Sequence, residues 1–105
     1  MGQFCAYHNP NPLTRHEYPY LLDVQNNLLN ELKTTVVIPL MLTDDTTSIR
    51  LSRLNPTFEI DGVSFTAMTQ EMAGLDRKYL GEKACDLSHL RSEIIGAIDF
   101  ILTGV

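Results

Sequence analysis

The chain has no tryptophan, only two cysteines, few cations and no long hydrophobic run. Its 8 Lys and Arg residues are outnumbered by 13 Asp and Glu residues, and the formal net charge is -5 at pH 7. Nucleic-acid binding depends on a wide basic face that neutralises phosphates, so we expect no direct nucleic-acid binding by this chain. The longest apolar runs, 36–42 and 100–102, are far shorter than a bilayer span, and no membrane segment is expected.

The cysteines and histidines do not form a metal-binding pattern. Cys5 and Cys85 lie far apart in the sequence, and His8 and His16 lie in a stretch rich in Pro and Asn. A zinc site needs several soft ligands at close spacing, so we expect no metal and no cofactor. The segment Met1–Gln3 begins no secretory signal, which favours a cytoplasmic protein with reduced, packed thiols.

Length and composition predict one globular domain that spans residues 1–105. Aromatic and β-branched segments predict short strands at 4–7, 18–25 and 35–40, and they favour a further short strand at 75–80. The run at 35–40 lacks polar alternation, which indicates burial on both faces. Pro39 cannot donate a ladder hydrogen bond, so we expect it at a strand end or on an edge.

A β-hairpin is the clearest local prediction. Segments 56–60 and 63–68 both alternate apolar and polar residues, and they flank the pair Asp61-Gly62. This pair is typical of a two-residue type I′ turn. The polar segment 43–55 shows no strong period and is interpreted as a connecting loop.

The periodicity changes after these strands. Apolar residues recur at a spacing of three to four: Leu87, Leu90, Ile94, Ala97 or Ile98, and Ile101. The spacing predicts a C-terminal helix with Asp86 or Ser88 as its N-cap and Gly104 at its C-terminal end. Gly96, inside this helix, suggests a close approach to another backbone. The predicted fold is mainly β, with five or six short strands in a small barrel or curled antiparallel sheet covered by one helix.

Residue types found in catalytic sites occur here, but their spacing favours structural roles. Asp86, Ser88 and His89 are the residue types of a catalytic triad, yet neighbours at the start of one helix point apart, and capping explains them better. Nothing in the spacing of four carboxylates forces them together: Asp44, Asp45, Glu59 and Asp61. Glycine-rich nucleotide-binding motifs are absent from the sequence.

Two segments leave alternatives open. Arg15, His16 and Glu17 could act as acid and base on an RNA phosphodiester, as in ribonuclease toxins on small barrels, or they could form a simple surface loop. The final segment, 99–105, is apolar and β-branched. It either completes the core or meets a partner.

Several short motifs, taken in order, resemble the CcdB toxins over nearly the whole chain. They are Asp23-Val24-Gln25 with Leu28-Leu29, Val37-Ile38-Pro39-Leu40, Leu54-Asn55-Pro56, Met68-Thr69 with Met72-Ala73, Asp86-Leu87-Ser88 with Arg91, Ile94, Ala97-Ile98 and Gly104. The resemblance implies a non-enzymatic toxin of a toxin–antitoxin module that poisons DNA gyrase. It also implies neutralisation by a CcdA-like antitoxin, with which the toxin represses its own operon.

The same resemblance implies an SH3-like barrel with a small additional sheet and a C-terminal helix, assembled as a homodimer. Carried over by position, the surface that binds the GyrA subunit of DNA gyrase comprises Leu28, Leu29, Asp99, Leu102, Thr103, Gly104 and Val105. The best-known family pattern ends in Trp-Gly-Ile, whereas this chain ends in Thr103-Gly104-Val105. Without the aromatic ring, binding would rely on Leu102, Val105 and the backbone. The alternatives are a ribonuclease toxin and a degenerate module that only occupies antitoxin.

Overall fold

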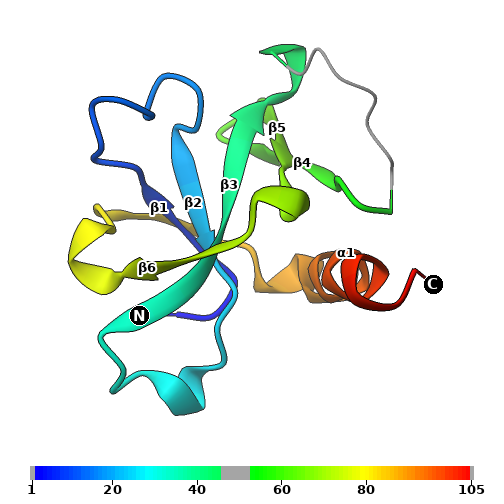
Figure 1. The fold of residues 1–105 in the computed structure, drawn as a ribbon. Coiled ribbons are helices and arrows are strands. Elements are labelled where there is room, and N and C mark those ends of the chain that lie inside the picture. Colours follow the sequence, from blue (N-terminus) through cyan, green and yellow to red (C-terminus); the bar gives the residue numbers. More distant parts are fainter. Residues whose placement is uncertain (1, 46–52, 105) are drawn as a thin grey trace.

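One curled antiparallel sheet and one C-terminal helix make up the fold (Figure 1). The computed structural model describes residues 2–45 and 53–104. Within these ranges the strands are β1 Cys5–His8, β2 Tyr20–Asp23, β3 Thr34–Leu42, β4 Thr57–Ile60, β5 Val63–Ala67, β6 Ala73–Asp76 and β7 Lys83–Asp86. Their order in the sheet is β4-β5-β3-β2-β1-β7, and β6 pairs with β3. The predicted mainly β fold with one terminal helix is confirmed.

The long central strand β3 organises the sheet because it pairs with three other strands. One edge pairs with β2, whereas the other pairs first with β6, through residues 34–37, and then with β5, through residues 40–42. Pro39 therefore lies inside a central strand and not at an end or on an outer edge, which corrects the expectation. Its carbonyl accepts a hydrogen bond from the Met68 amide at 2.9 Å. The nitrogen of Pro39 faces the same side, between the two pairings, so the missing N–H group breaks no ladder bond.

The hairpin prediction is confirmed by the backbone. Asp61 and Gly62 connect β4 to β5 and have φ values of 52° and 79°. Both values are positive, as a type I′ turn requires. The alternating pattern then turns Ile60 and Phe65 into the core.

The core lies between the concave face of the sheet and the helix α1, Arg91–Thr103. From the helix, Ile94 and Ala97 are buried, as the spacing predicted. The core cluster contains Phe4, Ala6, Leu22, Val24, Ile38, Leu40, Ile60, Phe65, Ala67, Leu87 and Ile94. Burial of this apolar surface is the main force that holds the helix against the sheet.

Three details differ from the sequence-based expectations. The strand expected at 75–80 is β6, which ends at Asp76 and is followed by the short 3₁₀ helix η4, Arg77–Tyr79. Strand β7 was not predicted at all. Gly96 is exposed, and a Cβ atom built there meets nothing within 4 Å, so the expected close approach to another backbone is wrong.

The helix starts later than the expected N-cap residues. A 3₁₀ turn, η5 Ser88–Leu90, precedes α1. The carboxylate of Asp86 accepts a hydrogen bond from the Ser88 amide at 2.7 Å, which supports the chain just before α1. The N-cap of α1 is Leu90, which makes no side-chain cap bond, so the expected N-cap at Asp86 or Ser88 is wrong. The segment expected to be a loop, 43–55, begins with the 3₁₀ turn η2, Thr43–Asp45, and its residues 46–52 lie outside the described ranges.

Candidate functional site

The C-terminal end of α1 extends beyond the strands and exposes apolar side chains (Figure 1). Leu102 is 72% exposed and Ile101 is 39% exposed, although Ile94 and Ala97 of the same helix are buried. The sheet covers the first part of the helix and does not reach its last turn. Of the two alternatives for this segment, completion of the core is therefore excluded for Leu102 within one protomer.

Local hydrogen bonds hold this helix end in place. Gly104 adopts a left-handed conformation, with a φ of 75°, and its amide donates to the Phe100 carbonyl at 2.9 Å. The Thr103 hydroxyl donates to the Asp99 carbonyl at 2.7 Å. The guanidinium of Arg53 lies 5.0 Å from the centre of the Phe100 ring. Val105, the remaining residue of the expected surface, lies outside the described residues.

A second apolar surface lies on the segment between β2 and β3. Leu28 is 89% exposed and belongs to the 3₁₀ helix η1, Asn27–Leu29. Leu29 and Leu32 are also exposed. The Asn26 side chain accepts a hydrogen bond from the Leu28 amide at 2.8 Å, which caps this short turn. We call residues 26–33 the leucine loop.

Two polar contacts fix the base of the leucine loop. The Gln3 amide donates to Asn27 Oδ1 at 2.9 Å, and Gln25 Nε2 donates to the Thr34 carbonyl at 3.0 Å. These bonds close the loop from both ends. Its leucines therefore have a defined position although none of them packs into the core.

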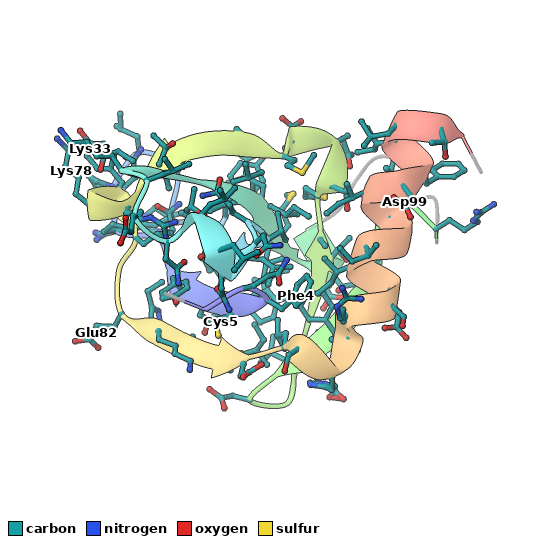
Figure 2. The ribbon with its side chains drawn as sticks, turned by 90° about the horizontal axis from the view of Figure 1, so that it is seen from below. Phe4, Cys5, Lys33, Lys78, Glu82 and Asp99 are labelled. Carbon is teal, nitrogen blue, oxygen red and sulfur yellow. The ribbon has the colours of Figure 1, made fainter. Side chains whose placement is uncertain are left out.

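The protomer does not bring the two apolar surfaces together. In Figure 1 the leucine loop lies below the sheet, whereas the end of α1 projects to one side. Figure 2, seen from below, shows Asp99 on the helix and Lys33, the last residue of the leucine loop, at the opposite side of the picture. The expected site residues thus form two separate exposed patches in one copy of the chain.

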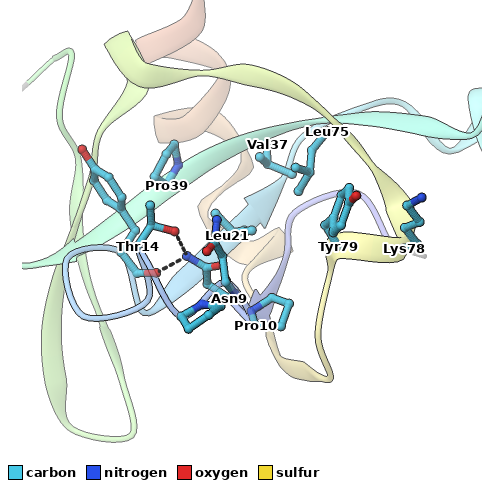
Figure 3. A pocket seen from close by; sticks show the side chains of 12 residues that line it. Asn9, Pro10, Thr14, Leu21, Val37, Pro39, Leu75, Lys78 and Tyr79 are labelled. Carbon is cyan, nitrogen blue, oxygen red and sulfur yellow. Dashed lines mark hydrogen bonds between the residues drawn. The ribbon is translucent and has the colours of Figure 1, made fainter.

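A hollow of about 840 Å³ lies elsewhere, beside the loop that follows β1 (Figure 3). Its walls are Asn9, Pro10, Asn11, Pro12, Thr14, Tyr18, Leu21, Val37, Pro39, Leu75, Lys78 and Tyr79. Asn9 Nδ2 shapes the loop by donating to Thr14 Oγ1 at 3.0 Å and to the Tyr18 carbonyl at 2.9 Å. Sequence reasoning missed this hollow, and its only local signal was the Pro- and Asn-rich stretch.

The residues considered for ribonuclease chemistry do not line this hollow. Arg15, His16 and Glu17 are all exposed on the loop. Next to them, burial and the nearby carboxylates of Glu17 and Glu71 raise the pKa of Tyr18. The Tyr18 hydroxyl, like an ordinary tyrosine hydroxyl, is protonated at neutral pH, and the raised pKa extends this state to higher pH.

The triad residue types before the helix form a local turn. Hydrogen bonds from Ser88 to the Asp86 carboxylate hold the pKa of Asp86 below its usual value. His89 is exposed and follows in the same 3₁₀ turn. This geometry stabilises the turn.

The two cysteines lie on neighbouring strands with free thiols. Cys5 on β1 is buried, and Cys85 on β7 is partly buried opposite Ala6. Burial and, secondarily, the charge of Asp61 raise the pKa of the Cys85 thiol.

In the part of the chain that the structure describes, no group of three His, Cys, Asp or Glu side chains could hold a metal ion. Over the same residues, no helix is long and apolar enough to cross a membrane.

Solved structures share this architecture. A mycobacterial endoribonuclease in complex with its cognate antitoxin matches with a TM-score of 0.72 at 17% identity, over 95% of this chain and 92% of that chain. A structure described as an Mtb toxin matches with a TM-score of 0.66 at 14% identity, over 89% of this chain and 94% of that chain. At these identities the matches show the fold, which is one that bacterial toxins use.

The family follows from the sequence itself. The family model described as CcdB protein matches residues 3–104. The chain therefore belongs to the CcdB family, the toxins of toxin–antitoxin modules.

Proposed function

We propose that this protein is a non-enzymatic toxin that binds the GyrA subunit of DNA gyrase and traps the enzyme on cleaved DNA. The proposal rests on one observation: the leucines at the positions expected to contact gyrase are exposed on well-fixed backbone. Leu102 is 72% exposed at the end of α1, and Leu28 is 89% exposed on the leucine loop. Complete burial of one such side chain in an interface gains about 1.5–3 kcal/mol.

The helix end replaces the aromatic anchor of the best-known family pattern. Thr103 is small and bonded back to the Asp99 carbonyl, so it cannot supply a large apolar contact. Leu102 supplies that area instead, together with the backbone of Gly104 and with Val105, which follows in the sequence. Ile101, which is also exposed, lies beside this patch, where a second copy of the chain would cover it.

A homodimer would unite the patches that one protomer keeps apart. We propose that the helix ends of two copies meet near a twofold axis, so that the last turns of both helices form one surface. The leucine loops of the two copies would flank it. An isologous arrangement of this kind presents the same residues twice to a symmetric target.

A CcdA-like antitoxin is the second proposed partner, in the cytoplasm. The net charge of -5 suits an antitoxin segment that carries Lys or Arg. The same charge leaves DNA contact in a repressor complex to the antitoxin. Operon repression by the toxin would thus depend entirely on that partner.

The decisive experiment is a supercoiling and DNA-cleavage assay with purified gyrase. The wild-type chain should inhibit supercoiling and produce gyrase-dependent breaks. Leu102→Ser should lower the potency at least about tenfold, because it removes the apolar area at the helix end. Leu13→Ser is the matched control, because Leu13 is 90% exposed on a loop outside the proposed surface, and it should act like the wild type.

This assay, together with RNA-cleavage and antitoxin-binding measurements, separates the alternatives. Lack of both inhibition and breaks with the wild-type chain would reject gyrase poisoning. Cleavage of single-stranded RNA by the chain, abolished by His16→Ala, would indicate a ribonuclease toxin instead. Tight antitoxin binding without either activity would indicate a degenerate antitoxin-binding module.

A further inference from the structure

Arg77 connects the leucine loop to the rest of the sheet. It is the first residue after β6, and its backbone amide donates to the Lys33 carbonyl at 2.8 Å. Its side chain then reaches further back along the loop. Nε donates to the Leu32 carbonyl at 2.7 Å, and Nη2 donates to the Leu29 carbonyl at 3.2 Å.

These bonds hold the backbone of a loop whose leucines are not anchored in the core. Leu28, Leu29 and Leu32 are exposed, so burial of their side chains contributes little to its position. Within the loop, the amide of Leu29 donates to the Asn26 carbonyl, and that of Leu32 donates to the Leu29 carbonyl. Such isolated 3₁₀ turns have poor hydrogen-bond geometry and are stable only with outside support.

The Arg77 guanidinium lies against the backbone of the leucine loop. Its Nη1 atom is buried and has no hydrogen-bond partner among the described residues. A buried donor without an acceptor is unfavourable, and the two carbonyl bonds on the same side chain offset that cost. A planar guanidinium can reach two carbonyls at once, which a lysine ammonium on a flexible chain does less well.

We propose that Arg77 is a positioning residue for gyrase binding: it fixes the leucine loop in the conformation that presents Leu28 and Leu29. The inference rests on the proposed function, since the loop carries part of the expected gyrase surface. A loop that is already ordered loses less conformational freedom when it binds. Arg77 itself need not touch the partner.

The test compares Arg77→Met with Lys78→Met in the full-length protein. The first variant keeps an apolar stem and removes both carbonyl bonds. The second changes the next residue of η4, whose ammonium lies over the Tyr79 ring instead, 5.2 Å from its centre. Arg77→Met should weaken binding to purified gyrase about tenfold and speed hydrogen exchange at the Leu32 amide. Lys78→Met should leave both measurements unchanged.

A double-mutant cycle distinguishes positioning from a general loss of stability. In a background with Leu28→Ser and Leu29→Ser, Arg77→Met should have no further effect on gyrase affinity, because the loop no longer contributes to it. An equal loss in both backgrounds would overturn the proposal. So would faster exchange at Leu32 with unchanged affinity.

The outcome also separates this inference from the proposed function. If the wild-type chain does not bind gyrase, the proposed function fails and the positioning role in binding fails with it. If the wild-type chain binds and Arg77→Met binds equally well, only the role of Arg77 fails. Arg77→Lys keeps the charge and should recover less than half of the lost affinity, and full recovery would overturn the argument from the two carbonyl bonds.

Discussion

Asp23 shows how a single buried carboxylate is accommodated in the core. The residue is 1% exposed at the end of β2, and its Oδ1 accepts hydrogen bonds from Thr35 Oγ1 at 2.7 Å and from the Gln25 amide at 3.2 Å. Its backbone carbonyl accepts from the Phe4 amide. Buried polar groups are tolerated only when such partners replace water. Asp23 therefore forms hydrogen bonds to three segments: strand β3, the residue just before β1, and the segment that leads into the leucine loop.

Thr35→Val tests this role. Valine has nearly the same shape but cannot donate to Asp23, which would leave the buried carboxylate with one donor fewer. We expect the free energy of unfolding to fall by about 2 kcal/mol. Urea unfolding measures it, and Thr34→Val, at an exposed position of the same strand, should change stability by less than about 0.5 kcal/mol. Equal effects of the two substitutions would contradict the argument.

At the level of elements, the local predictions succeeded where hydrogen bonds close within a few residues. The turn Asp61-Gly62 and the helix with its glycine C-cap depend only on neighbouring residues, and both are confirmed. Strand β7 was missed because Lys83–Asp86 has weak β propensity and alternates little. It becomes a strand because it pairs with β1, at the other end of the chain. A pattern within Lys83–Asp86 cannot predict that pairing.

Gly96 inside α1 and Gly104 at its C-cap should respond to alanine in opposite directions. Gly96 is exposed in the helix interior with open space around it, so Gly96→Ala should raise the free energy of unfolding by about 0.5–1 kcal/mol. Gly104 has a φ of 75°, which strains any L side chain, so Gly104→Ala should lower it by about 1 kcal/mol. Thermal unfolding of both variants measures the signs, and destabilisation by Gly96→Ala would contradict the open environment.

In the whole molecule, the residues of the expected gyrase surface lie in two separate patches, the end of α1 and the leucine loop. Figures 1 and 2 show the helix end and the leucine loop as separate features of one protomer. An exposed Ile101 next to Leu102 is a surface that a second copy would cover favourably. The proposed homodimer therefore gives both the covered area and the united binding surface.

Sedimentation equilibrium at micromolar concentration should give twice the chain mass of 11.8 kDa. Ile101→Asp places a charge in the proposed contact, so we expect it to raise the dissociation constant of the dimer at least about tenfold. Leu13→Asp, at an exposed position outside the contact, should leave the dimer intact. A wild-type chain that sediments as a monomer would contradict the proposed assembly.

The sequence by itself determined the family, the mainly β class, the hairpin turn and the helix with its C-cap. These features depend on residue order and on bonds between near neighbours. Tertiary structure alone decided the place of Pro39 between two pairings, the hollow beside the loop after β1 and the contact of Arg77 with the leucine loop. Each of these joins segments that are distant in sequence. The exposure of Ile101 is of the same kind: its helical period matches the core residues of α1, and only the limited reach of the sheet leaves it partly uncovered.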